Sequence, residues 1–117
     1  MKVILVNGSP HKEGCTYTAL KEVERELINS GVETEMIWLG VKPVSGCLGC
    51  AQCIRKGPNG EKPTLRCVIN DGVNEFLDKA EKADGFVFGS PVHYAAISGA
   101  LSSFMDRAFY GKGKIFR

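Results

Sequence analysis

The most constraining feature of this sequence is a short, uninterrupted apolar segment, Lys2–Asn7, which is followed at once by Gly8-Ser9-Pro10. An apolar run without alternation is typical of a strand that helices cover on both faces, as in parallel sheets. Gly85–Gly89 repeats the pattern, and Val32–Leu39 supplies another strand of similar length. The sequence therefore predicts an α/β fold around a parallel sheet.

Three other segments carry apolar residues at helical spacing. The first ends at Ser30-Gly31, where glycine can close a helix, and the second begins after Asp71, which we expect to cap it. Between the second strand and the second helix, Gly40–Cys67 is rich in proline, glycine and cysteine and predicts a long loop. The helical positions are Leu20, Val23, Leu27, Val73, Phe76, Leu77, Ala80, Leu101, Phe104, Met105 and Ala108.

This order of elements predicts a doubly wound sheet with strand order 2-1-3, in which ligands bind at the carboxyl ends of the strands. The third strand would then be an exposed apolar edge, which native folds normally cover. We therefore expect residues 1–117 to form a single domain that lacks its remaining strands, with Gly111–Arg117 as a linker toward a fourth strand.

Composition excludes several classes of function. The 15 basic and 13 acidic residues are scattered, without the basic stripe that a nucleic-acid-binding surface needs. No apolar stretch approaches the ~20 residues that cross a bilayer, so no membrane association is expected. An odd number of cysteines, five, fits reduced thiols or metal ligands in the cytoplasm better than a disulfide framework.

The segment Gly8–Thr16 joins the first strand to the first helix and is rich in small and hydroxyl residues. A helix amino terminus attracts anions through its free N–H groups and its dipole, and Ser9 and Thr16 add hydroxyl donors. The spacing fits neither the nucleotide P-loop nor the dinucleotide fingerprint. A phosphate monoester therefore suits this segment, although an ordinary strand-to-helix turn would use similar residues. We name Gly8–Thr16 the phosphate loop.

The segment Ser90–Gly99 follows the third strand and offers aromatic surfaces at the same sheet edge. His93 and Tyr94 can flank a flat ring while backbone amides donate to its heteroatoms. The alternative is that Tyr94 packs into a core and His93 makes structural hydrogen bonds. We name this segment the ring loop.

The paired motifs of these two loops resemble those of the NADPH-dependent FMN reductase family of flavodoxin-like proteins, with its iron–sulfur flavoprotein relatives. Gly-Ser-Pro-His-Lys-Glu-Gly-Cys-Thr is similar to the family's phosphate loop, and Gly-Ser-Pro-Val-His-Tyr-Ala-Ala-Ile-Ser-Gly-Ala-Leu to its flavin-ring loop. Phe104-Met105-Asp106-Arg107 resembles the end of a family helix. The resemblance implies a flavodoxin-like fold that binds FMN. The residues that it places around the phosphate are Ser9, His11, Gly14, Cys15 and Thr16. Those that it places along the ring are Pro91, Val92, His93 and Tyr94.

The resemblance also implies an oxidoreductase that passes electrons from NAD(P)H through FMN to a small acceptor such as flavin or a quinone, in a homodimer or homotetramer. No catalytic acid or base can be assigned from the sequence. Two other functions stay open, an electron carrier of the iron–sulfur flavoprotein type and a non-catalytic flavin-binding fragment. Family members are longer than this chain, which resembles their amino-terminal part.

A cysteine cluster in the long loop bears on the choice between these functions. Cys47, Cys50 and Cys53 repeat a two-residue spacing, and Cys67 lies farther along. Thiolates so spaced can converge on a [4Fe-4S] cluster. Zinc binding and reduced thiols without a metal are the alternatives.

Overall fold

The computed structural model of the chain describes residues 1–112, which fall into two compact units. The first unit contains Met1–Pro43 and Lys82–Ser102, and the second contains Val44–Glu81 and the chain from Ser103 onward. Of the expected linker Gly111–Arg117, residues 113–117 lie outside the described residues. Its first two residues, Gly111 and Lys112, are helical, so the linker does not begin at Gly111. None of the helices in residues 1–112 is long and apolar enough to cross a membrane.

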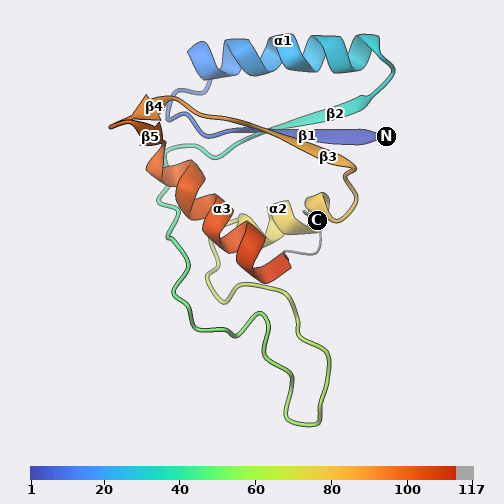
Figure 1. Cartoon of the computed structure of the whole chain (residues 1–117), viewed down its shortest axis with the longest axis vertical. Helices are drawn as coiled ribbons and strands as arrows, with labels where there is room; N and C mark the ends of the chain where they lie inside the picture. The colour runs from blue at the N-terminus through green and yellow to red at the C-terminus, as the bar shows by residue number, and fades with distance from the viewer. Residues whose placement is uncertain (113–117) are drawn as a thin grey trace. The chain divides into compact units, whose positions relative to one another are not determined.

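The first unit is built on a parallel sheet with the predicted strand order (Figure 1). Its strands are β1 (Lys2–Asn7), β2 (Glu33–Trp38) and β3 (Gly85–Gly89), in the order β2-β1-β3. Both neighbours run parallel to β1, and Asn7 is paired with Trp38 on one side and Gly89 on the other. The carboxyl ends of all three strands therefore lie at one edge of the sheet.

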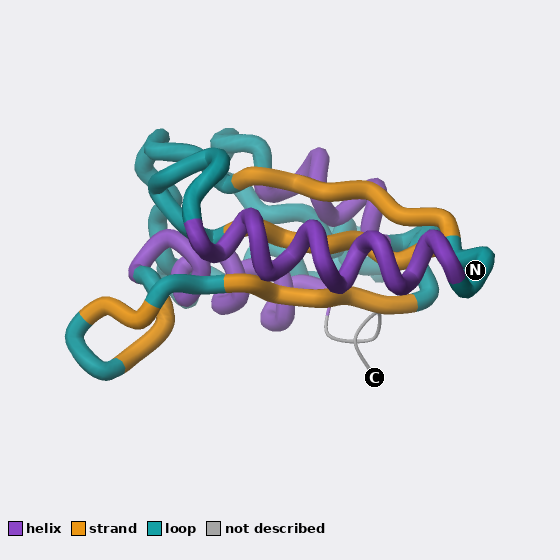
Figure 2. Tube along the Cα trace, turned by 90° about the horizontal axis from the view of Figure 1, so that it is seen from above, coloured by secondary structure: helices purple, strands orange, loops and turns teal. Residues whose placement is uncertain are grey.

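Helix α1 (Cys15–Asn29) packs along this sheet, as Figure 2 shows from above. β1 is the central strand, and its residues 3–7 are all buried, which explains the uninterrupted apolar run. Leu20 of α1 lies against Gly89, where an added Cβ would come within 2.8 Å of the leucine side chain. The helix ends as predicted, with Ser30 as its C-cap and Gly31 at φ +80°.

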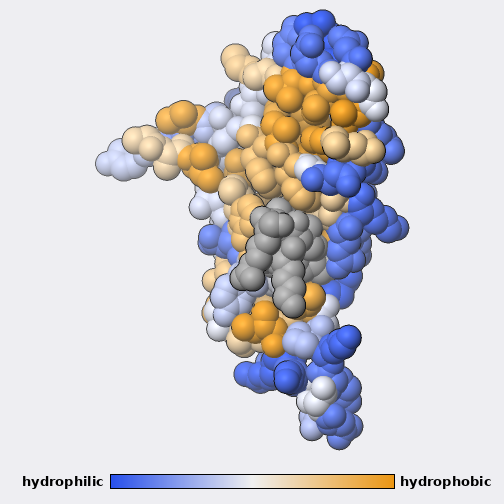
Figure 3. All heavy atoms as spheres, turned by 45° about the vertical axis from the view of Figure 1, so that its right-hand side comes forward, coloured by the Kyte–Doolittle hydropathy of each residue, from blue (hydrophilic) through white to orange (hydrophobic). Residues whose placement is uncertain are grey.

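After β3 the chain forms a two-stranded hairpin that the sequence did not reveal. β4 (Val92–His93) and β5 (Ala96–Ile97) pair antiparallel around a turn in which Tyr94 and Ala95 have φ values of 46° and 61°. The hairpin projects from the end of the sheet and carries apolar surface (Figures 1 and 3). Tyr94 at its tip is fully exposed, so the expected alternative of a core tyrosine is wrong.

The second unit contains α2 (Val73–Ala80) and all but the first turn of α3 (Gly99–Lys112). Phe76 of α2 and Phe104 of α3 are buried and meet edge to face, with ring centroids 4.6 Å apart. Residues 39–72 form neither helix nor strand, in agreement with the predicted long loop.

The start of α2 differs from the expected one. Gly72, at φ +91°, is the N-cap residue, and no side chain caps the helix. Asp71 instead forms an ion pair with Arg107 of α3. The two residues are far apart in the sequence, so local sequence signals do not reveal this pair.

Candidate functional site

The phosphate loop is shaped by the last residue of β1, Asn7, whose side chain is fully buried. Its Oδ1 accepts a hydrogen bond from the Ser9 amide at 3.0 Å, and its Nδ2 donates to the Lys12 carbonyl at 3.2 Å. Ser9 Oγ in turn accepts from the His11 amide at 3.1 Å. Asn7 thus fixes the loop at two points, a role that its position within the strand conceals in the sequence.

Trp38, at the end of β2, supports the same loop from the neighbouring strand. Its indole Nε1 donates to the Ser9 carbonyl at 2.8 Å. The ammonium group of Lys12 lies 5.8 Å from the centre of the indole ring, within the range of a cation–π contact. Both interactions hold the loop beside the end of β2.

The helix that follows the loop begins without a side-chain cap. Gly14 is the N-cap residue, and α1 has no acidic residue in its first turn. The first amides of a helix lack partners within the helix, so they attract an anion when no side chain occupies them. Among the predicted phosphate ligands, Ser9 is buried and Gly14 and Thr16 are half-buried, while His11 and Cys15 are exposed.

The ring loop lies next to the phosphate loop, because β1 and β3 are neighbouring strands. The Gly8 amide donates to the Gly89 carbonyl at 2.8 Å, directly where the two loops begin. Of the predicted ring contacts, Pro91 is half-buried, whereas Val92, His93 and Tyr94 are exposed on the hairpin. The structure thus brings both predicted loops to one edge of the sheet.

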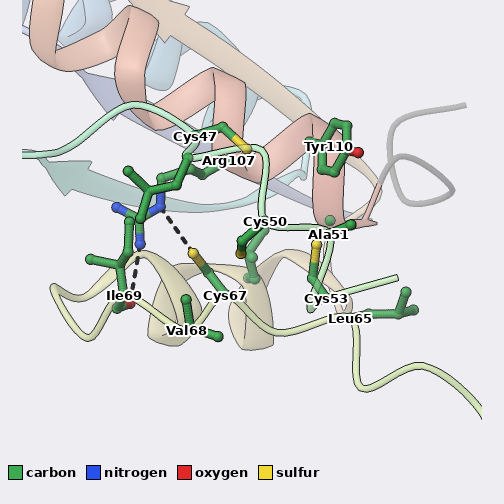
Figure 4. A pocket seen from close by; sticks show the side chains of 13 residues that line it. Cys47, Cys50, Ala51, Cys53, Leu65, Cys67, Val68, Ile69, Arg107 and Tyr110 are labelled. Atoms are coloured by element: carbon green, nitrogen blue, oxygen red, sulfur yellow. Dashed lines mark hydrogen bonds between the residues drawn. The ribbon is translucent and has the colours of Figure 1, made fainter. Parts of the chain in front are cut away.

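The second unit holds a separate feature, a pocket lined by all four cysteines of the long loop (Figure 4). Apolar side chains complete its wall, including Leu65, Leu77 and Tyr110. None of the chain's cysteines, all of which lie in residues 1–112, forms a disulfide. The members of this cysteine pocket are Cys47, Cys50, Cys53 and Cys67.

Arg107 of α3 is the buried charge of the cysteine pocket. Its Nε donates to Cys67 Sγ at 3.3 Å, and its Nη2 donates to Asp71 Oδ1 at 2.7 Å. Its Nη1 donates to the Ser45 carbonyl and to Asp71 Oδ2, and its Nη2 also donates to the Ile69 carbonyl. The guanidinium holds the pKa of Asp71 below its usual value, and that carboxylate raises the pKa of Arg107.

The cysteine pocket has the donor type of a soft metal or cluster site, since thiolates bind zinc and iron–sulfur clusters. Within residues 1–112, however, no three cysteine, histidine or acidic side chains are close enough to hold a metal ion together. Burial raises the pKa of the Cys53 thiol, which favours its protonated form. The thiols therefore share a pocket but are not arranged as a closed coordination shell.

Comparison with known proteins adds a family to this geometry. The sequence profile described as NADPH-dependent FMN reductase matches residues 1–117. An iron-sulfur flavoprotein of Methanocaldococcus jannaschii is 39% identical over 92% of this chain and 52% of its own length. Another, from Archaeoglobus fulgidus, is 33% identical over 92% of this chain and 45% of its own length. The chain thus spans about half the length of these curated relatives.

A solved structure supports the fold. The crystal structure of Smu.1420 from Streptococcus mutans matches with a TM-score of 0.64 over 93% of this chain and 53% of its own. The two sequences are 19% identical, so this likeness concerns the fold alone.

Proposed function

The chain belongs to the NADPH-dependent FMN reductase family, and on this basis we propose that it forms the FMN-binding part of an NAD(P)H-dependent oxidoreductase. The family indicates a flavoprotein of the FMN reductase type. The proposal adds the electron donor, NAD(P)H, and a small acceptor such as flavin or a quinone. Bound FMN would supply the redox chemistry, accepting a hydride from nicotinamide and passing electrons on.

One observation carries the proposal: the ring loop and the phosphate loop, which leads into the uncapped start of α1, begin side by side at the carboxyl edge of the sheet. There the first amides of α1, with the hydroxyls of Ser9 and Thr16, would bind the phosphate of FMN. His11, Gly14 and Cys15 complete the proposed phosphate site. The proposed ring contacts are Pro91, Val92, His93 and Tyr94, and the exposure of the last three leaves them accessible to a ring.

Titration of the full chain with FMN tests the cofactor assignment. We expect saturable binding with the absorption bands of a bound, oxidised flavin. Thr16→Val, which removes one proposed phosphate donor, should weaken FMN binding about tenfold, as expected for a hydrogen bond to a charged group. Thr64→Val in the long loop is the matched control and should bind FMN like the wild type. Absence of FMN binding by the wild type would refute the assignment.

The electron donor needs a separate measurement. We expect the FMN-loaded protein to oxidise NADH or NADPH in the presence of free flavin or a quinone. A flavin that binds but is not reduced by either nucleotide would refute the proposed donor while leaving the cofactor assignment intact.

A second function is favoured by the cysteine pocket, namely electron transfer through an iron–sulfur cluster together with FMN. Its support is that four thiols line one pocket and that Arg107 donates to the sulfur of Cys67. The curated relatives named above carry the name iron-sulfur flavoprotein. Thiolate ligation by Cys47, Cys50, Cys53 and Cys67 would require the loop to draw these side chains closer together.

Iron and sulfide analysis of anaerobically purified protein tests this second function. A bound cluster would give stoichiometric iron and acid-labile sulfide, and Cys67→Ser would lower both. Cys15→Ser is the matched control, because Cys15 lies at the start of α1 and not in the cysteine pocket. Zinc without sulfide, or no metal at all, would exclude the cluster.

A further inference from the structure

Two serines at the ends of the hairpin segment join it to the phosphate loop. Ser98 is 3% exposed, and its Oγ donates to the Gly8 carbonyl at 2.7 Å. The same oxygen accepts from the Leu101 amide at 3.2 Å, in the first turn of α3. Ser90 Oγ accepts from the Ser98 amide at 2.8 Å and donates to the Pro91 carbonyl. Ser98 therefore contacts the phosphate loop, the start of α3 and the base of the hairpin at once.

We infer that Ser98 is a positioning residue that couples the phosphate loop to the ring loop, so that a phosphate group bound by the first loop orders the second. The inference rests on the proposed function. Gly8 is held from both ends of the ring loop, because its amide donates to Gly89 and its carbonyl accepts from Ser98. A buried hydroxyl that loses its partner is costly, so a shift of Gly8 carries the base of the hairpin with it.

The hairpin depends on this anchor because it has little stability of its own. Only two residue pairs, Val92 with Ile97 and His93 with Ala96, join β4 to β5. Its residues 92–97 are all exposed, and its turn places two non-glycine residues at positive φ. Isolated two-stranded hairpins are marginal in water. The conformation of the hairpin therefore depends strongly on the hydrogen bonds at its base.

Hydrogen exchange of the full chain tests the coupling with inorganic phosphate as the probe. Saturating phosphate should slow exchange in residues 8–16, which it contacts, and also about fivefold in residues 92–97, which it does not contact. In Ser98→Ala the effect on residues 8–16 should remain, while the effect on residues 92–97 should disappear. Ser102→Ala, at an exposed position of α3, is the matched control and should behave like the wild type.

Flavin affinities provide an independent measurement. Riboflavin has the ring without the phosphate, so the ratio of its dissociation constant to that of FMN reports the benefit of the phosphate. We expect Ser98→Ala to reduce this ratio about tenfold. Ser90→Ala leaves the Ser98 contacts with Gly8 and α3 in place and should also reduce the ratio of the two dissociation constants. This second variant keeps the test decisive if Ser98→Ala does not fold.

The coupling would be overturned if phosphate slowed exchange at residues 92–97 equally in Ser98→Ala and the wild type, or did not slow it in the wild type. An equal loss of FMN and riboflavin affinity would also overturn it, because a merely structural role predicts that pattern. Failure of the wild type to bind FMN would refute the proposed function instead. The phosphate experiment would still decide the coupling.

Discussion

Arg107 is the residue on which the second unit depends most visibly. Its side chain is almost completely buried, and its hydrogen bonds reach Ser45 on one limb of the long loop and Cys67, Ile69 and Asp71 on the other. A buried ion pair contributes modestly when intact, but removal of one partner is strongly destabilising because it leaves an uncompensated charge. The pair with Asp71 is therefore the sensitive point of this unit.

Asp71→Asn should lower the free energy of unfolding at pH 7 by about 3 kcal/mol. The pKa of Asp71 is held below its ordinary value of 3.8, so the wild-type pair stabilises the protein above that pH. This contribution is lost as the pH falls through the depressed folded-state pKa. Urea unfolding at pH 7 and pH 3 should show a smaller difference between the two pH values for the variant than for the wild type.

Asp78→Asn is the matched control for that experiment. Asp78 pairs with Arg66 at 2.6 Å, but both side chains are about half-exposed. Exposed pairs contribute at most about 1 kcal/mol, so this variant should remain close to the wild type. Equal losses in both variants would show that the Arg107 pair has no special role.

Asn7, the buried residue that holds the phosphate loop, permits a second test. Asn7→Asp keeps the shape of the side chain but replaces the amide that donates to the Lys12 carbonyl with a fully buried carboxylate. Unfolding in urea should show a loss of about 2–3 kcal/mol. The exposed Asn29→Asp at the end of α1 should lose less than about 1 kcal/mol, and a similar loss in both would contradict the role assigned to Asn7.

Among the elements, β3 permits a direct test of how closely α1 packs on the sheet. An added Cβ at Gly89 would lie 2.8 Å from Leu20, whereas one at Gly85 would lie 3.5 Å from Val3, an ordinary contact. Gly89→Ala should therefore cost about 1–3 kcal/mol by overpacking. In thermal unfolding, the melting temperature of Gly89→Ala should lie well below that of Gly85→Ala. The reverse order would refute the packing argument.

The elements that were predicted well have local signals. The sequence predicts Gly85–Gly89 at its observed bounds, because an apolar run between glycines is typical of a strand in a parallel sheet. The hairpin has no such signal, because its strands have two residues each and its turn uses Tyr94 and Ala95 rather than glycine or asparagine. A positive φ at such residues cannot be anticipated from residue type.

The candidate site also has one part that the sequence reveals and one part that it does not. The phosphate loop could be located because a strand, small residues and a helix follow one another in the sequence. The residues that support this loop could not be identified from the sequence, since each acts through a hydrogen bond that depends on the folded arrangement. These residues are Asn7, Trp38 and Ser98. A polar residue at the end of an otherwise apolar strand, such as Asn7, is the one signal that was available.

Among residues 1–112, the long loop is mostly exposed and lies outside helices and strands. Arg55 and Lys56 are exposed within it. Exposed loops are the preferred sites of proteolysis, so brief digestion with trypsin should cut first after one of these two residues among residues 1–112. Mass spectrometry identifies the cut. First cleavage after Lys21 or Arg25, which are exposed but helical, would contradict this expectation.

The attachment of both limbs of that loop to Arg107 has a consequence for how such chains diverge. Once the ends of a loop are fixed, each doubling of its length costs only about 0.6 kcal/mol in closure entropy. Insertions and deletions between Cys53 and Cys67 should therefore accumulate during evolution with little penalty. The same changes between Cys67 and Asp71 would disrupt the spacing of groups that share one guanidinium, and selection should remove them.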